Sequence, residues 1–256
     1  MGTGSSASTS GEPGAPPSCA QHYERLHAEC LGVMKRTFAH DTDARQAESH
    51  SLIAELERWL DAIGVRPERY VLRLAAKEYQ FALLSLVQGL YRNAFSGLRL
   101  FFELGLAAVH FSSNCLELNE WLSGDRDLNW SALTDSNDGI FSKRYARAFF
   151  PGLTDVALDY GGLATSVYRE CSEYVHGNAD THVTLPDTVE FDSEAFGAWH
   201  DKAKVVATVM TFALCLRYLP ELDTSGIGPL EPSLQERVGH VSAIRERLGG
   251  PVEEQP

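Results

Sequence analysis

Apolar residues recur at helical spacing along most of this chain. Between residues 41 and 63 they stand three or four positions apart, which places them on one face of a helix. Gly64 directly after this segment is typical of a helix C-terminus. Similar patterns, separated by Gly and Pro, predict further helices. In all we expect helices over 19–39, 41–63, 67–90, 91–122, 141–150, 154–176, 193–219 and, weakly, 234–248.

Two segments depart from this helical pattern. Residues 124–139 are polar and lie between two tryptophans, and they are expected to form a long connection. Connections longer than about 12–15 residues are uncommon and often functional. In the segment 179–192, β-branched residues flank a Pro-Asp turn, which predicts a small β-hairpin or a loop excursion.

The order of these elements predicts an all-α fold, a single-domain helical bundle. Residues 1–18 are rich in Gly, Ser and Pro and are expected to form a disordered leader. The helical domain is expected over 19–220, because no linker interrupts its central part. Residues 221–256 are expected to form a flexible tail with one weak helix.

The charge and the cysteine content indicate which partners and which cellular compartment we expect for this protein. The net charge of -13 disfavours unspecific binding to nucleic acid, so an RNA partner would be recognised by a small site. Five widely spaced cysteines without a CxxC pair indicate a reducing compartment. The apolar runs 95–111 and 205–219 carry charges or fall short of the roughly 20 apolar residues that a spanning helix needs. We therefore expect core helices, no membrane partner and a cytoplasmic protein.

The segment YRECSEYVHGN at 168–178 holds the strongest candidate chemistry. Arg169 and His176 are seven residues apart, so they share one helix face at a spacing of about 10 Å along the axis. Ser172 and Glu173 lie between them, and Asn178 follows in the predicted cap. Histidine can transfer a proton near neutral pH, and arginine can stabilise charge on a phosphate. This face could therefore serve phosphodiester chemistry.

A purely structural interpretation of the same residues is also open. Arg169 and Glu173 have the spacing of an intrahelical salt bridge. His176 stands in the last turn, where a cation favours the helix dipole, and Gly177 can end the helix. Cys171 could be a thiol nucleophile, but its place on the apolar stripe favours a buried structural cysteine.

A second group of charges lies in the apolar segment 91–122. Arg99 and Glu103 are four residues apart, and His110 follows seven residues later. Charges in such a setting must be paired. They form either a buried structural pair or the wall of a cleft that meets the Arg169 stripe. No metal or cofactor is expected, since the spacing of His176, Asp180 and His182 fits no strong ligand motif.

The run AFSGLRLFFELGL at 94–106, followed by YRECSEYVHGN, resembles bacterial members of the HEPN superfamily over about residues 65–219. These proteins are helical bundles that carry an Arg, four to six residues, and then a His on a late helix. Arg169, six residues and His176 match that spacing. The family often has Asn, Asp or His directly after the Arg, whereas this chain has Glu170.

The resemblance implies a metal-independent ribonuclease of a toxin–antitoxin or phage-defence system, acting on RNA as a homodimer. It implies that His176 is the general base or a hydrogen-bond donor and that Arg169 holds the scissile phosphate. The supporting residues would be Ser172, Glu173, Asn178, Arg99 and Glu103.

Two alternatives stay open. The first is a non-catalytic helical binding or sensing subunit with a partner protein of a defence assembly, which the acidic charge and Glu170 favour. The second is a small-molecule enzyme built on Arg99, Glu103 and His110.

Overall fold

A computed structural model describes residues 17–40, 44–175 and 185–251. These residues form an all-α fold, which confirms the predicted fold class; they contain no β-strand. Two 3-10 turns, η1 and η2, connect helices. The helices are α1 (Cys19–His40), α2 (Arg45–Ile63), α3 (Arg69–Val87), α4 (Tyr91–Phe111), α5 (Cys115–Ser123), α6 (Trp130–Leu133), α7 (Lys143–Phe149), α8 (Ala157–Val175), α10 (Ser193–Tyr218), α11 (Thr224–Ile227), α12 (Glu231–Val238) and α13 (Ser242–Arg247).

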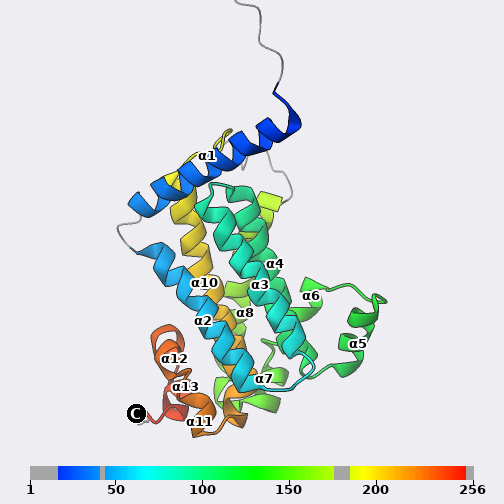
Figure 1. Ribbon diagram of the computed structural model, residues 1–256. Helices are drawn as coiled ribbons and strands as arrows, with labels where there is room; N and C mark the ends of the chain where they lie inside the picture. Colours follow the sequence, from blue (N-terminus) through cyan, green and yellow to red (C-terminus); the bar gives the residue numbers. More distant parts are fainter. Residues whose placement is uncertain (1–16, 41–43, 176–184, 252–256) are drawn as a thin grey trace, which may run out of the picture.

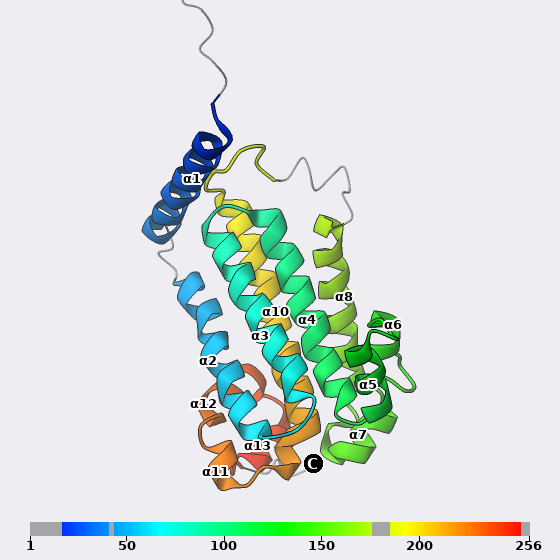
Figure 2. The same ribbon diagram turned by 45° about the vertical axis from the view of Figure 1, so that its right-hand side comes forward.

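The long helices form a bundle around α4 and α10 (Figures 1 and 2). Helices α3 and α8 both pack on α4, and α10 packs on α2, α4 and α8. Helix α1 crosses one end of this bundle, and α7 and α11 to α13 gather at the other end. Helices α5 and α6 lie along the side of the bundle, against α4. Helix α8 therefore lies on the side of the bundle opposite α2.

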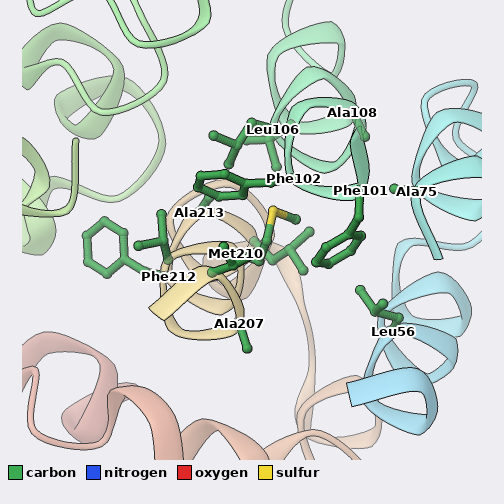
Figure 3. Packing of buried hydrophobic residues seen from close by; sticks show 14 of the residues in the cluster. Leu56, Ala75, Phe101, Phe102, Leu106, Ala108, Ala207, Met210, Phe212 and Ala213 are labelled. Atoms are coloured by element: carbon green, nitrogen blue, oxygen red, sulfur yellow. The ribbon is translucent and has the colours of Figure 1, made fainter. Parts of the chain in front are cut away.

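Helices α4 and α10 are apolar on most sides because they form the core. Phe102 and Met210 lie between them, and Phe101 points toward Leu56 of α2 (Figure 3). Phe212 points to the other side of α10, where its ring stacks on Tyr160 of α8. Gly105 permits the close approach of α4 and α10: a Cβ on it would lie 2.5 Å from the Met210 methyl carbon. Both helices are long and apolar enough to cross a membrane, but 72% and 78% of their most apolar windows are buried in the bundle. Such burial is what the sequence predicted for core helices.

The segment 91–122 was predicted as one helix but forms two. Helix α4 ends at Phe111, and α5 begins at Cys115. Between them, the side chains of Ser113 and Asn114 both donate to the carbonyl oxygen of His110, at 3.0 Å each. Such side-chain bonds compete with the helical hydrogen bonds of the backbone and end the helix.

The predicted β-hairpin at 179–192 is wrong for its described part. Residues 185–192 form bends and extended chain without strand pairing, and residues 179–184 lie outside the described residues. The backbone N–H and C=O of Asp192 pair with the hydroxyl of Tyr91 instead of a second strand, at 2.8 and 3.2 Å. The Asp192 side chain caps α10 by accepting the N–H of Ala195.

The C-terminal part is folded through residue 251, whereas the sequence predicted a flexible tail with one weak helix. Helices α11, α12 and α13 cover the lower end of α2 and α10, and their apolar residues are buried. Arg237 of α12 binds Glu55 of α2 through two hydrogen bonds of 2.8 and 2.9 Å, and both side chains are buried. Helices this short are not stable alone, so tertiary packing must stabilise them. Local sequence patterns do not reveal such packing.

Candidate functional site

Helix α8 is amphipathic, and this places the candidate residues on its surface. A stripe at helical spacing is buried against α4 and α10. It consists of Tyr160, Ala164, Val167 and Cys171. The opposite face is exposed and ends in Arg169 and Glu173. Of the pattern at 168–178, the charged residues Arg169, Glu170 and Glu173 are therefore presented to solvent.

The guanidinium of Arg169 is exposed and has no hydrogen-bond or ion-pair partner in the described parts of the chain. The intrahelical salt bridge with Glu173, which the structural interpretation requires, is not formed. An exposed arginine without a protein partner keeps all its donors available for an anion.

Arg169 lines an open cleft of about 680 Å³ between α8 and the segment 134–141. Phe141 contributes to the lining, and Glu173 lies at the C-terminal end of α8. Hydroxyl groups line much of the remaining wall; they belong to Thr134, Ser136, Thr165 and Ser166. The predicted connection at 124–139 thus forms one wall of the site, and it contains the short helix α6.

Glu170, which departs from the family pattern, is paired. Lys202 of α10 donates to its carboxylate at 2.7 Å, and Ser166 donates at 3.3 Å. The bond from Lys202 lowers the pKa of the Glu170 carboxyl. The pKa of Lys202 is raised in turn: burial opposes its charge, but the bond to Glu170 outweighs this. The negative charge beside Arg169 is therefore compensated within the protein.

Arg99 and Glu103 meet α8 at Tyr168, the residue directly before Arg169. An Arg99 nitrogen donates to the Tyr168 hydroxyl at 2.5 Å, and the guanidinium carbon lies 4.7 Å from the centre of the ring. The Tyr168 hydroxyl is 3.5 Å from the Glu103 carboxylate, which is 4.0 Å from Arg99. Burial raises the pKa of Tyr168, so the hydroxyl stays protonated. The charges of α4 thus contact the predicted stripe.

Trp130 of α6 covers the same tyrosine. Its ring is parallel to that of Tyr168 within 5°, with ring centroids 3.6 Å apart, and it also contacts Phe102 of α4. Stacking of this kind is worth about 1 kcal/mol beyond the buried area. It attaches the segment that forms the outer wall of the cleft to α4 and α8.

The last turn of α8 is attached to the N-terminal end of α4. Arg92 donates to the carbonyl oxygen of Tyr174 at 2.7 Å, and the Tyr174 ring stacks on Phe95 at 3.7 Å. A cation at the exposed carbonyls of a helix end is favourable. These contacts fix the direction of the chain immediately before His176.

The remaining residues that the sequence predicted for the site either make structural contacts or lie outside the described residues. The Ser172 hydroxyl donates to the Tyr168 carbonyl at 2.7 Å, which is a bond within the helix. Cys171 is buried, and burial raises its thiol pKa to about 12, so it is no nucleophile at neutral pH. His176 and Asn178 lie outside the described residues.

The predicted small-molecule site on α4 is not formed. The ring of His110 lies 3.0 Å from the Glu117 carboxylate of α5, which Arg126 also binds at 3.3 Å. This ion group anchors α5, and the small cavity beside His110 is not lined by Arg99 or Glu103. His110 therefore has a structural role.

Sequence reasoning missed four residues that shape the site: Trp130, Tyr168, Lys202 and Arg92. Tyr168 had been assigned only to an apolar stripe, and Lys202 stands 32 positions from its partner. Comparison with protein-family models, curated proteins and solved structures gives no significant match to this chain.

Proposed function

We propose that this protein is a metal-independent ribonuclease of HEPN type that serves in a bacterial toxin or phage-defence system. One observation carries the proposal. Arg169 is exposed in an open cleft without a protein partner among the described residues, and it stands seven residues before His176 on the same helix pattern. A salt-bridged or buried arginine would have favoured a structural role.

The proposed reaction needs an arginine, a histidine and the RNA alone. Arg169 binds the non-bridging oxygens of the scissile phosphate, and His176 accepts the proton of the ribose 2′-OH. The 2′ oxygen then forms a bond to phosphorus while the bond to the 5′ oxygen breaks. The leaving 5′ oxygen takes up a proton, and the products carry a 2′,3′-cyclic phosphate and a 5′-OH.

The residues around Arg169 contribute to the proposed reaction in different ways. Tyr168, held by Arg99 and Glu103, fixes the turn of α8 that carries Arg169. The Ser172 hydroxyl is engaged within the helix, and Glu173 remains at the edge of the cleft. The cytoplasm, where RNA is abundant, is the proposed compartment.

A homodimer is part of the proposal, and exposed apolar side chains on the paired helices α3 and α4 support it. Phe81, Leu84 and Leu100 are 50%, 48% and 41% exposed. These two helices pack closely, since a Cβ on Gly97 would lie 2.9 Å from the Ala82 methyl carbon. Exposed apolar side chains on two neighbouring helices can pair with their own copies across a two-fold axis. Leu100→Arg should convert a dimer to a monomer in size-exclusion chromatography with light scattering; a monomeric wild-type protein would contradict the proposal.

The second candidate function is a non-catalytic binding or sensing subunit with a protein partner. The carboxylates that share the cleft with Arg169 favour it: Asp135, Glu170 and Glu173. RNA degradation in EDTA separates the two functions. The ribonuclease degrades cellular RNA and loses this activity on His176→Ala, whereas a binding subunit leaves every RNA intact.

A further inference from the structure

The cleft extends well beyond Arg169. Its lining runs along α8 from Leu158 to Glu173. From Leu158 to Arg169 this is about 16 Å along the helix axis. That length matches about five stacked nucleotides at about 3.4 Å each. A single phosphate at Arg169 would leave most of the cleft unused.

Adjacent glycines in α8 have opposite surroundings. A Cβ on Gly161 would lie 3.1 Å from the Cβ of Phe141, so helix packing explains this glycine. A Cβ on Gly162 would meet no atom within 4 Å. A glycine inside a helix lowers the stability of the fold by about 1 kcal/mol relative to alanine. At Gly162 no close contact within the described protein requires a glycine. Its position in the cleft leaves room for another molecule to approach the helix.

Helix α7 is basic in a strongly acidic protein. It begins two residues after Phe141 and lies at the N-terminal end of α8 (Figure 2). Its exposed cations are Lys143, Arg144 and Arg147. Arg144 pairs with Asp138, whereas Lys143 and Arg147 have no ion-pair partner among the described residues. Because these two residues are four apart, they share one helix face.

Two of the carboxylates near the cleft are already engaged. Asp135 accepts the backbone N–H groups of Asn137 and Asp138, at 2.8 Å each. Glu170 is bound by Lys202. Arg169 in the cleft and Lys143 and Arg147 on the neighbouring helix α7, in contrast, lack such partners in the described structure. This distribution favours a ligand that carries several negative charges along an extended chain.

We infer that the cleft binds a single-stranded stretch of RNA next to the scissile bond, with one phosphate on Arg169 and the strand continuing past Leu158 to Lys143 and Arg147 of α7. This inference rests on the proposed ribonuclease function and adds the path of its substrate. The hydroxyls of the wall face the riboses and bases. Gly162 leaves space for the strand to pass over α8.

The test uses full-length His176→Ala protein and a short fluorescein-labelled RNA, with anisotropy measured from about 50 to 200 mM salt. Lys143→Ala/Arg147→Ala should weaken binding about fivefold, as two exposed ion pairs would. The slope of log affinity against log salt should fall by about 1.4, or about 0.7 for each lost phosphate contact. The matched control is Arg58→Ala, which removes an exposed cation from α2 on the other side of the bundle.

A second variant tests the cleft itself. Gly162→Gln should weaken RNA binding at least tenfold while it raises the melting temperature, so loss of folding cannot explain the result. If Lys143→Ala/Arg147→Ala and Gly162→Gln both leave the RNA affinity and the salt slope unchanged while wild-type protein still cleaves RNA, the inferred RNA path is wrong and the proposed ribonuclease function stands. If wild-type protein cleaves no RNA, the proposed function falls as well.

Discussion

The ammonium of Lys202 lies 2.7 Å from the carboxylate of Glu170, the residue that follows the candidate catalytic Arg169. An acidic residue there would repel a phosphate if its charge were uncompensated. The lysine comes from α10, one of the two central helices of the bundle. The departure from the family pattern at Glu170 is thus matched by a cation that sequence proximity does not reveal.

Removal of this cation should impair the proposed RNA reaction. Lys202→Met leaves Glu170 unpaired beside Arg169, and we expect RNA affinity to fall about fivefold, which corresponds to about 1 kcal/mol. The double variant Lys202→Met/Glu170→Gln should regain most of the affinity, because both charges are absent. Equal losses in the single and double variants would show that the pair has no electrostatic role at the site.

The same pair gives a pH dependence of stability with a defined sign. The folded protein lowers the carboxyl pKa of Glu170 below its ordinary value of 4.5. Its contribution is therefore present above about pH 4.5 and is lost as the pH falls through the lowered pKa. The pKa of Lys202 is raised above its ordinary value of 10.5, so its contribution is complete below that value and is lost as the pH rises through the raised pKa.

Urea unfolding of wild-type and Glu170→Gln protein measures this effect. The difference in unfolding free energy should be at most about 1 kcal/mol, because Glu170 is half exposed. It should be constant between about pH 6 and 9 and should vanish in acid. A difference that grows below pH 4 would contradict the assignment.

The two glycines of α8 should respond differently to larger residues. Gly162→Ala should stabilise the protein by about 1 kcal/mol, since helix propensity improves and no atom is displaced. Gly161→Ala should give a smaller gain or none, because the new methyl group presses on Phe141. Gly161→Leu should destabilise the fold. Thermal unfolding measures all three, and equal stabilisation at both positions would contradict the described packing.

The sequence predicted the elements that rest on long periodic patterns. Helix α10 was expected over 193–219 and spans Ser193–Tyr218, because its apolar residues fill the core throughout. The break between α4 and α5 was missed, since it depends on side chains of Ser113 and Asn114 that bond back to the helix end. The C-terminal helices were missed because their stability comes from packing rather than from local preference.

The site was predicted in part. Helical spacing separated Arg169 from the apolar stripe of its helix, and the structure places it in the cleft. One of the two interpretations of Arg99 and Glu103 had them meet the Arg169 stripe, and they contact it at Tyr168. Spacing could not reveal Lys202, or the stacking of Trp130 on Tyr168, because these contacts depend on how distant helices pack. It also suggested that His110 belonged with Arg99, but Glu117 of α5 binds that histidine instead.

Cleavage of RNA in EDTA tests the central claim most directly. Wild-type protein should cut a cellular RNA to products with 2′,3′-cyclic phosphate ends, and a 2′-deoxy residue at the cut site should block the reaction. Arg169→Ala and His176→Ala should each lower the rate at least 100-fold, while the exposed control Arg58→Ala should leave it unchanged. Intact RNA in the presence of wild-type protein, or full activity of Arg169→Ala, would contradict the account.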